Sequence, residues 1–507
     1  MLIMRKLKRF YSFSFDSFII LLILLIVITF SQKDISACTA FVLKDSNNVV
    51  LGFSFDFHVG SHCIYVNKRN VERNRYLLLA EKPVKWVSKY GSITYNLLGK
   101  DWPHSGMNEA GLAVQCLGAQ DEGAEYPHPD NRIPIDESGW IQYQLDNSAS
   151  IEDVIENMQK IRVSNRSLGE AHFLICDKSG NAIIIEYVNG VIKTYTEDNL
   201  PYPITANDTY PHMLNYLKEH KGFGGVKEFK YRVGASVCRF VYVANKITEY
   251  QGQLKPIVGY SFDILKDLRQ NEDGTRYQTV YDITNLSIHY NVSSDFGKLK
   301  TIHFKEFDFD CDTPDLMTEI QSDKSGNIRD AFYNYNSDVN KRVIFNTVKM
   351  VIDYIPEVAM ANMTKYADKS KCFHDQKPSS NSVLSKSDND LSKLTVFLGD
   401  LSESNISINQ DVTNTVFNFK VKLDRKAPKQ VSFGLEVPQE SSVVPGYHLF
   451  ITPNPILIEK GEKSATVTAT LISSHFEVGN KYKLIINLLS DEVTVGKKNQ
   501  FVIHVHK

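Results

Sequence analysis

Residues 38–57 read CTAFVLKDSNNVVLGFSFDF, and this stretch decides the fold. Two runs rich in β-branched and aromatic residues, TAFVL and VVLGFSFDF, flank the turn-rich segment KDSNN. Such a pattern predicts two strands joined by a turn. The first strand begins directly after Cys38. The sequence therefore places a cysteine at the entrance of a strand pair, which raises the question of what the thiol does there.

The segment before Cys38 has the order of a secretory signal peptide. A basic start is followed by the unbroken apolar run 18–30 and by a short polar stretch that ends in Ala37. This order predicts residues 1–37 as a signal peptide, with cleavage between Ala37 and Cys38. A retained anchor is the alternative, although a spanning helix needs roughly 20 apolar residues. The letters ISAC also match a bacterial lipobox, in which Cys38 would be lipidated. We expect a secreted, periplasmic or cell-surface protein.

Composition narrows the classes of partner. The chain has 507 residues, a net charge of −2 and no basic tail or cluster, which argues against nucleic acid. Apart from the leader, no run has the length and apolar character of a membrane span. The seven cysteines show no CxxC or metal spacing, so we expect no metal, and no disulfide pairing can be read from them. The oligomeric state stays open.

The character of the chain changes twice along its length. Short strands with a few helices extend to about residue 310, and the chain reads as helical over 327–366. A polar, Ser-rich stretch at 368–393 has the composition of a linker. After it, short alternating runs separated by turns predict a small β-sandwich. We therefore predict a first domain at 38–367 and a sandwich at 394–507, available for contact with another protein or surface.

A cysteine at a new N-terminus has a chemical use. A thiol attacks as the thiolate, and a free cysteine has a pKa of about 8.5. Cleavage before Cys38 would free an α-amine with a pKa of about 7.7–8.0 beside that thiol. The amine can accept the thiol proton and later return it to a leaving amine. Cleavage would therefore switch on a nucleophile that carries its own base.

The opening stretch resembles the start of the choloylglycine hydrolase and penicillin V acylase family, which belongs to the N-terminal nucleophile hydrolases. The resemblance covers roughly Cys38 to Cys311. It implies an α+β fold of the αββα type, in which two stacked antiparallel sheets lie between helical layers, and a site without cofactor or metal. Further matches follow in family order: YGSITYNLLGKDWPHSGMNEAGLAV, IQYQLDNSASIEDVIENM, HFLICDKSGNAIIIEY, ITANDTY and SVCRF.

The resemblance implies five site residues. The family nucleophile falls on Cys38, and the aspartate that holds the terminal amine falls on Asp56. The oxyanion asparagine falls on Asn207, the second oxyanion donor on Gly118 through its backbone N–H, and the late arginine on Arg239. Taken singly, an acid, an asparagine and a glycine are also ordinary turn residues, and an arginine is most often exposed. The letters NDT at Asn207 are in addition a glycosylation sequon.

One position departs from the family pattern. Members usually carry GRNxD before the aspartate, whereas this chain reads GFSFD, with Phe53 in the place of the arginine. In the family this arginine lies against the cysteine and lowers the thiol pKa, which Phe53 cannot do. We expect an arginine introduced at position 53 to lie beside the thiol with Asp56 as its partner.

Two functions compete. The first is an exported amidase that cleaves a linear non-peptide amide C–N bond of a small N-acyl compound through a thioester on Cys38. Candidate substrates are conjugated bile salts, penicillin V, acyl-homoserine lactones and N-acyl amino acids. The stretch VSKYGSITYN and Trp102 suggest an aromatic acyl pocket. The second is a catalytically impaired binding or surface protein on the same fold, which Phe53 and the appended β domain favour.

Overall fold

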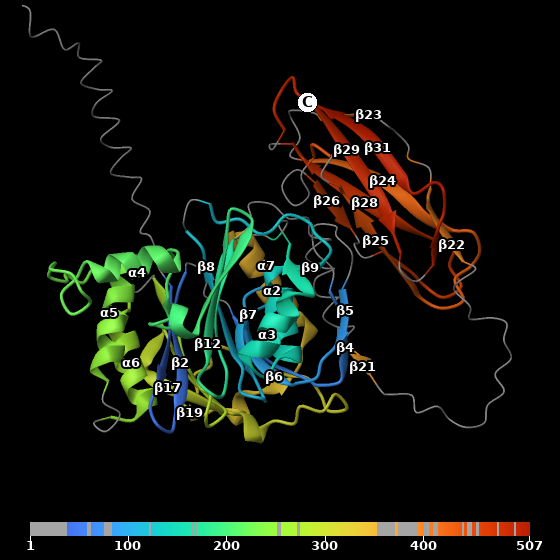
Figure 1. Cartoon of the computed structure of the whole chain (residues 1–507). Helices are drawn as coiled ribbons and strands as arrows, with labels where there is room; N and C mark the ends of the chain where they lie inside the picture. The colour runs from blue at the N-terminus through green and yellow to red at the C-terminus, as the bar shows by residue number, and fades with distance from the viewer. Residues whose placement is uncertain are drawn as a thin grey trace, which may run out of the picture.

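The structure is a computed structural model in which the elements fall into two bodies (Figure 1). The predicted signal peptide lies outside the described residues, and so does most of the predicted linker. The described residues are 38–57, 62–75, 84–120, 123–164, 167, 170–250, 255–270, 274–351, 371–373, 394–399, 401, 405–408, 414–438, 441–443, 449–452, 456–473, 476–490 and 493–507.

The first sheet contains the strand pair predicted from the opening stretch. β1 and β2 are antiparallel, with Thr39 opposite Ser54 and Lys44 opposite Val49. Asp45 forms the turn between them, because its Oδ1 accepts from the backbone N–H groups of Asn47 and Asn48, both at 2.8 Å. The prediction of a strand pair is therefore confirmed. In spatial order the sheet is β14 (Ile204–Thr205), β1 (Thr39–Lys44), β2 (Val49–Asp56), β15 (Thr275–Asp282), β16 (Ser287–Val292), β17 (Asp295–His303) and β19 (Gly326–Asn327).

The second sheet is antiparallel throughout and packs face to face against the first. One core cluster contains Phe41 and Tyr281 of the first sheet together with Ile93 and Ile184 of the second. Burial of these apolar faces against each other drives the stacking. The order is β13 (Val191–Thr196), β12 (Ala182–Val188), β11 (Ala171–Cys176), β8 (Ala113–Gly118), β7 (Pro103–Asn108), β6 (Ser92–Asn96), β3 (Cys63–Asn67), β18 (Leu316–Glu319) and β20 (Tyr333–Asn334).

Helices cover the outer face of each sheet. α5 (Ser236–Glu249) and α6 (Ile257–Asp267) contact β1 and β2, and α4 (Tyr210–Lys218) packs on α5. α2 (Glu137–Asn147) and α3 (Ile151–Met158) lie against the second sheet, and Figure 1 shows these two groups on opposite sides. Ser150 caps α3 in a capping box with Asp153, as its position before the apolar pattern predicts. The layers therefore run helix, sheet, sheet, helix, and the expected α+β class is confirmed.

Short elements complete the first body. β9 (Ile133–Ile135) pairs with β10 (Ile161–Val163), and 3₁₀ turns span Glu197–Asn199, Phe304–Glu306 and Arg329–Ala331. α7 (Ser337–Val351) lies within the range predicted as helical, whose remainder from residue 352 on lies outside the described residues. No helix in the described part of the chain is long and apolar enough to span a membrane.

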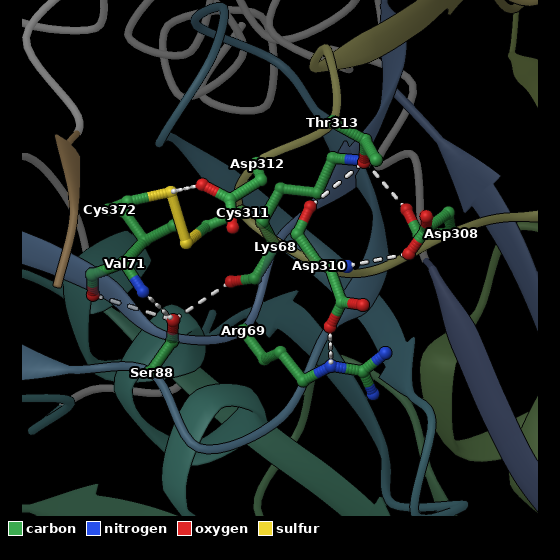
Figure 2. Close-up of a disulfide and its surroundings, with 10 residues drawn as sticks. All are labelled: Lys68, Arg69, Val71, Ser88, Asp308, Asp310, Cys311, Asp312, Thr313 and Cys372. Carbon is green, nitrogen blue, oxygen red and sulfur yellow. Dashed lines mark hydrogen bonds and ion pairs between the residues drawn. A yellow bond between two sulfur atoms is a disulfide. The ribbon is translucent and has the colours of Figure 1, made fainter. Parts of the chain in front are cut away.

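A disulfide reaches into the range predicted as a linker. Cys311 and Cys372 are bonded across 61 residues of sequence, with their Cα atoms 5.4 Å apart (Figure 2). β21 (Lys371–Cys372) adds to β4 (Val71–Arg75), which pairs in turn with β5 (Val84–Val87). Asp312 lies beside the disulfide, but oxidised sulfurs offer a metal ion no thiolate. The segment at 371–373 is therefore part of the first body.

The second body consists of two sheets around their own core. Its strands alternate core-facing and outward residues, as in β31, where Phe501, Ile503 and Val505 are buried. In the described residues, the first sheet has the order β26 (Leu449–Thr452), β28 (Ser464–Ile472), β24 (Asn414–Leu423), β22 (Thr395–Leu398) and β30 (Thr494–Val495). The second has the order β23 (Asn405–Ser407), β31 (Gln500–His506), β29 (Lys481–Leu489), β25 (Val431–Glu436) and β27 (Ile456–Ile458).

Candidate active site

Cys38 lies at the entrance of β1 and is held against the end of β2. Its Sγ accepts a hydrogen bond from the backbone N–H of Asp56 at 3.4 Å, and its thiol reaches the Asp56 carbonyl oxygen at 3.5 Å. Only 8 % of the residue is exposed. Because Thr39 pairs with Ser54, the same register places Cys38 opposite Phe55. The thiol is therefore fixed by backbone groups and borders an aromatic side chain.

Asn207 lies on the other side of Cys38. β1 and β14 pair Ala40 with Thr205 and Phe41 with Ile204, so the register continued by two residues places Cys38 opposite Asn207. The backbone N–H of Asn207 donates to Ser236 Oγ at 2.9 Å, and its Nδ2 donates to the carbonyl of Gly118 at 2.7 Å. Asn207 is 4 % exposed, so the sequon is buried. The asparagine amide is thus held beside the thiol and beside Gly118.

The backbone of Gly118 faces the same side as the Asn207 amide. In an antiparallel pair, hydrogen-bonded and non-hydrogen-bonded positions alternate. The backbone N–H of Ala119 donates to the carbonyl of Glu170 at 3.1 Å, so these two residues form a hydrogen-bonded pair. The next pair, Gly118 and Ala171, is therefore a non-hydrogen-bonded pair. Its N–H and carbonyl therefore point away from β11, toward the edge where Asn207 binds. The role of the Gly118 N–H as an oxyanion donor stays a prediction.

Arg239 and Asp56 form a buried ion pair behind the thiol. Arg239 Nη2 lies 2.5 Å from Asp56 Oδ2, and both side chains are fully buried. Arg239 Nε donates to Thr39 Oγ1 at 2.6 Å, while Nη1 donates to the carbonyls of Val233 and Leu268. The arginine is therefore no surface residue. Its contact with Thr39 ties α5 to the residue that follows the cysteine.

Two hydroxyl groups bind one oxygen of the Asp56 carboxylate. Thr275 Oγ1 donates to Oδ1 at 2.5 Å, and Ser54 Oγ donates to the same oxygen at 3.1 Å. Burial raises the pKa of Asp56, and the Arg239 guanidinium and the Thr275 hydroxyl act against that rise. Sequence reasoning missed Thr39, Ser54 and Thr275. Thr39 and Ser54 adjoin predicted site residues in sequence, whereas nothing local to Thr275 indicates its role.

Burial leaves the thiol of the uncleaved chain protonated. It raises the pKa of Cys38 to about 12, and the negative charge of Asp56 adds to the effect. The Asp56 backbone N–H and the Arg239 charge act in the opposite direction but do not cancel the rise. In this chain the Cys38 nitrogen is an amide, bonded to Ala37, and it cannot accept a proton. The uncleaved site therefore lacks the terminal amine that would serve as the base.

Phe53 does not face Asp56, which makes one expectation wrong. Residues directly opposite in adjacent strands share a face, and successive residues alternate faces. Phe53 pairs with Ala40, so it shares the face of Ala40 and Cys38, while Ser54 and Asp56 point to the helix side. An arginine at position 53 would therefore have no access to Asp56. The strand period of two already implies this orientation, because positions 53 and 56 differ by an odd number.

Aromatic rings and two histidines fill the thiol side of β2. The rings of Phe55 and Tyr277 stack at 5.0 Å between centroids, and His62 and His104 lie 4.8 and 5.2 Å from Phe55. His104 Nε2 lies 2.5 Å from the Tyr277 hydroxyl. Burial, followed by the neighbouring His62, lowers the pKa of His104 well below its usual value. Neither histidine was singled out from the sequence.

The expected aromatic surroundings are present in part. Tyr95, from the stretch VSKYGSITYN, stacks on Tyr277 at 5.2 Å between centroids. Phe53 completes the group at 6.1 Å from both Phe55 and Tyr277. The rings therefore form one continuous apolar wall, which begins at the residue opposite Cys38. Trp102 is buried as well.

Comparisons with known proteins give matches that lie in the first part of the chain. Residues 38–233 match the family model of linear amide C–N hydrolases, choloylglycine hydrolase family. The penicillin V acylase of Pectobacterium atrosepticum is 26 % identical over 221 residues, which cover 40 % of this chain and 57 % of that protein. The bile salt hydrolase/transferase of Lactiplantibacillus plantarum is 24 % identical over 192 residues, which cover 36 % and 57 %. The chain thus spans a little over half the length of these relatives.

The fold agrees as well. The structure of penicillin V acylase from Agrobacterium tumefaciens superposes with a TM-score of 0.50 at 23 % identity, covering 59 % of this chain and 98 % of that one. A likeness at this identity supports the fold alone. Together with the family match, which begins at Cys38, it supports the layered fold of the first body. Residues 38–233 are therefore similar to the choloylglycine hydrolase family of linear amide C–N hydrolases.

Proposed function

We propose that the chain, once cleaved before Cys38, is an exported amidohydrolase that cleaves a linear amide C–N bond of a small N-acyl compound. One observation carries this proposal. The thiol of Cys38 lies against the backbone of Asp56, whose carboxylate is held by Arg239, and the strand register places Asn207 on the other side of the thiol. A nucleophile, an anion for the terminal amine and an oxyanion donor thus occupy one strand end.

Cleavage before Cys38 supplies the missing base. The α-amine takes the thiol proton, and the thiolate attacks the amide carbonyl carbon. The C–N bond breaks, the ammonium returns a proton to the leaving amine, and the acyl group remains on Sγ as a thioester. Water then attacks the thioester, the carboxylic acid leaves and the thiol is restored. Asp56, whose backbone lies against the thiol, carries the negative charge that would hold the ammonium form of the terminus.

Two donors suit the oxyanion of the tetrahedral intermediate. An asparagine amide has two N–H groups, and only one is needed for the bond from Asn207 to the Gly118 carbonyl. The second N–H of Asn207 and the backbone N–H of Gly118 lie on the same side of β8. Removal of one such donor costs roughly 3 to 4 kcal/mol of transition-state stabilisation in well-studied hydrolases. Neither donor requires a metal ion or a cofactor.

The aromatic wall supports an apolar acyl group. Phe55, which faces Cys38, stacks on Tyr277, and Tyr95 continues the stack. An apolar acyl chain bonded to Sγ would be buried against these rings and removed from contact with water. The two relatives named above act, by their names, on penicillin V and on bile salts, and both names imply a bulky apolar acyl part. We therefore propose N-acyl compounds of this type as substrates.

The disulfide supports export. Disulfides persist in oxidising compartments and are rare where thiols are kept reduced. Cys311–Cys372 lies in the first body, and the family match begins at the residue that follows the predicted cleavage site. Lipidation of Cys38 is the alternative that would abolish the mechanism, because it attaches a diacylglyceryl group to the sulfur through a thioether bond and leaves no thiol.

Phe53 favours a second candidate, a binding protein without catalysis. The ring is fully buried and packs on Phe55 and Tyr277, so no cation lies at the family arginine position. A less acidic thiol attacks more slowly at neutral pH. In this case the same surface would bind an N-acyl compound without cleaving it.

The test begins with the exported protein. Intact mass and N-terminal sequencing should give a chain that begins with an unmodified Cys38. The purified protein is then incubated with penicillin V, a glycine-conjugated bile salt and an N-acyl amino acid, and the free amine is measured. Cys38→Ser should fold and lose nearly all activity. A wild-type chain with the expected terminus that binds these compounds but releases no amine would support the second candidate.

A further inference from the structure

Two side chains from other elements hold the backbone of the segment that carries Asn207. The backbone N–H groups of Asn207 and Asp208 both donate to Ser236 Oγ, at 2.9 and 3.1 Å. The backbone N–H of Tyr210 donates to Glu186 Oε1 at 2.6 Å. Ser236 and Glu186 are 6 % and 2 % exposed, so both acceptors are largely shielded from solvent. We call Ser236 and Glu186 the clamp.

The hydroxyl group of Ser236 serves the Asn207 segment and not its own helix. The N-cap position of α5 is Ala235, which offers no side-chain acceptor to the first N–H groups of the helix. Alanine is among the least favoured residues at an N-cap, whereas serine is among the most favoured. The serine follows one residue later, and its oxygen accepts from residues 207 and 208. A local choice that forgoes stability in this way is typical of functional sites.

The first turn of α5 holds the groups on both sides of the thiol. Ser236 and Arg239 are three residues apart, and residues at this spacing lie on the same face of a helix. Arg239 Nη2 lies 2.5 Å from Asp56 Oδ2, and Ser236 Oγ accepts from Asn207. The two ends of the sequence SVCR, which the family resemblance had singled out for its arginine, therefore fix the two sides of the site relative to each other.

We propose that Ser236 and Glu186 are positioning residues, which hold the Asn207 amide where it binds the oxyanion of the tetrahedral intermediate. The inference rests on the proposed function, because it gives these residues a task in acyl transfer to Cys38. An oxyanion donor is effective only when it already points to the place where the charge develops. The bond from Nδ2 to the Gly118 carbonyl orients the end of the asparagine side chain, and the clamp holds its main chain.

The size of the expected effect follows from what the clamp leaves intact. Removal of an oxyanion donor costs about 10²–10³ in kcat. Loss of one clamp residue keeps the Asn207 donor and disturbs only its position, and a displacement of about 1 Å can still cost about 10²-fold. We therefore expect a loss of about tenfold or more in the rate of acylation of Cys38.

The experiment compares two reactions of one thiol in the full exported chain that begins at Cys38. The ester p-nitrophenyl phenylacetate acylates the thiol through a tetrahedral oxyanion, and p-nitrophenolate leaves as the thioester forms. Iodoacetamide alkylates the same thiol by displacement of iodide, and no oxyanion forms. Both reactions require the thiolate, so the ratio of their rates at one pH reports on stabilisation of the oxyanion.

Acylation is followed by release of p-nitrophenolate and by intact mass. Alkylation is followed by mass spectrometry of the peptide that contains Cys38, and Cys38→Ala gives the background of both reactions. Ser236→Ala should lower the acylation-to-alkylation ratio by about tenfold or more, equivalent to about 1.4 kcal/mol. Ser236→Thr keeps the hydroxyl group and should restore most of the ratio. Where an amide substrate is cleaved, Ser236→Ala should lower kcat and leave KM almost unchanged.

Glu186 provides a second variant pair, which does not depend on how the Ser236 variants fold. Glu186→Leu removes the acceptor for the Tyr210 N–H and should lower the ratio, whereas Glu186→Gln keeps an acceptor oxygen and should lower it less. The matched control is Ser150→Ala, which removes a hydroxyl group that accepts from the Asp153 N–H at 3.3 Å. Because α3 lies on the outer face of the other sheet, this variant should leave the ratio within about twofold.

The outcomes separate the clamp from the proposed function. A wild type that is acylated by the ester but releases no amine from any amide would contradict the amidase proposal, and the ratio would still test the clamp. The clamp is overturned if Ser236→Ala and Glu186→Leu leave the ratio unchanged, if they slow acylation and alkylation equally, or if Ser150→Ala lowers the ratio as much. A wild type that is alkylated but never acylated would overturn it as well.

Discussion

The reactivity of Cys38 should depend on whether residue 37 is still attached. In the uncleaved chain, burial and the charge of Asp56 raise the thiol pKa to about 12. The unperturbed value for this comparison is 9.0, so the thiol pKa is about 3 units higher, or about 4 kcal/mol against forming the thiolate. At neutral pH the thiolate fraction is then roughly three orders of magnitude below that of a free cysteine. Alkylation of the uncleaved site should therefore be very slow.

Removal of residue 37 changes both the charge beside the thiol and the availability of a proton acceptor. The new ammonium places a positive charge next to the thiol, which favours the thiolate, and its neutral form can accept the thiol proton. We expect the pH of half-maximal alkylation to fall by at least about two units. The sign is fixed, because a cation close to a thiol can only lower its pKa.

The assay compares two forms of one protein. One begins at Cys38, and the other keeps Ala37 and an upstream tag. Both are treated with iodoacetamide over a range of pH, and labelling of the peptide that contains Cys38 is followed by mass spectrometry. Cys38→Ala gives the background, and alkylation in denaturant confirms that reagent and peptide are detected. Coincident pH profiles in two folded proteins would show that the terminal amine does not act on the thiol.

Three further predictions follow from the buried groups and the domain boundary. Phe53→Arg should lower the free energy of unfolding in urea by at least about 3 kcal/mol, because it buries a charge away from Asp56, whereas Phe53→Leu should cost less than half as much. Arg239→Met should lower the free energy of unfolding by about 3–5 kcal/mol, because it leaves the buried Asp56 carboxylate unpaired. Adding Asp56→Leu to this variant should restore most of the lost stability. Equal stabilities of the single and double variants would contradict the ion-pair account. A chain that ends near residue 390 should keep the amidase activity, and a soluble but inactive product would place part of the site in the C-terminal body.

The local sequence predicted the elements that depend on local patterns. The strand pair after Cys38 follows from two apolar runs around a turn, and β1 and β2 confirm it. The site residues came from motif resemblance alone. The structure brings Cys38, Asp56 and Arg239 into contact and joins Asn207 to Gly118, although 183 residues separate Asp56 from Arg239. Distances of that kind are set by packing of the sheets and do not appear in local sequence.

Two features lay beyond the reach of the sequence for different reasons. The pairing of Cys311 with Cys372 joins a strand-end loop to a polar stretch that reads as linker, and spacing carries no information about such a bond. The orientation of Phe53 could have been predicted. Positions 53 and 56 differ by an odd number, so a regular strand puts them on opposite faces. The motif resemblance predicted which residues lie near the thiol. It did not predict on which face of the sheet each side chain lies.

The short strand at residues 371 and 372 has a practical consequence for anyone who dissects this protein. It covers one side of β4, which lies between β21 and β5. A fragment stopped at the end of α7 would still contain the cysteine, aspartate, asparagine and arginine of the site, and its sequence would look complete. It would nevertheless expose a row of unpaired backbone groups on β4 and a free thiol at Cys311, the two features most prone to cross-link and aggregate one molecule with the next.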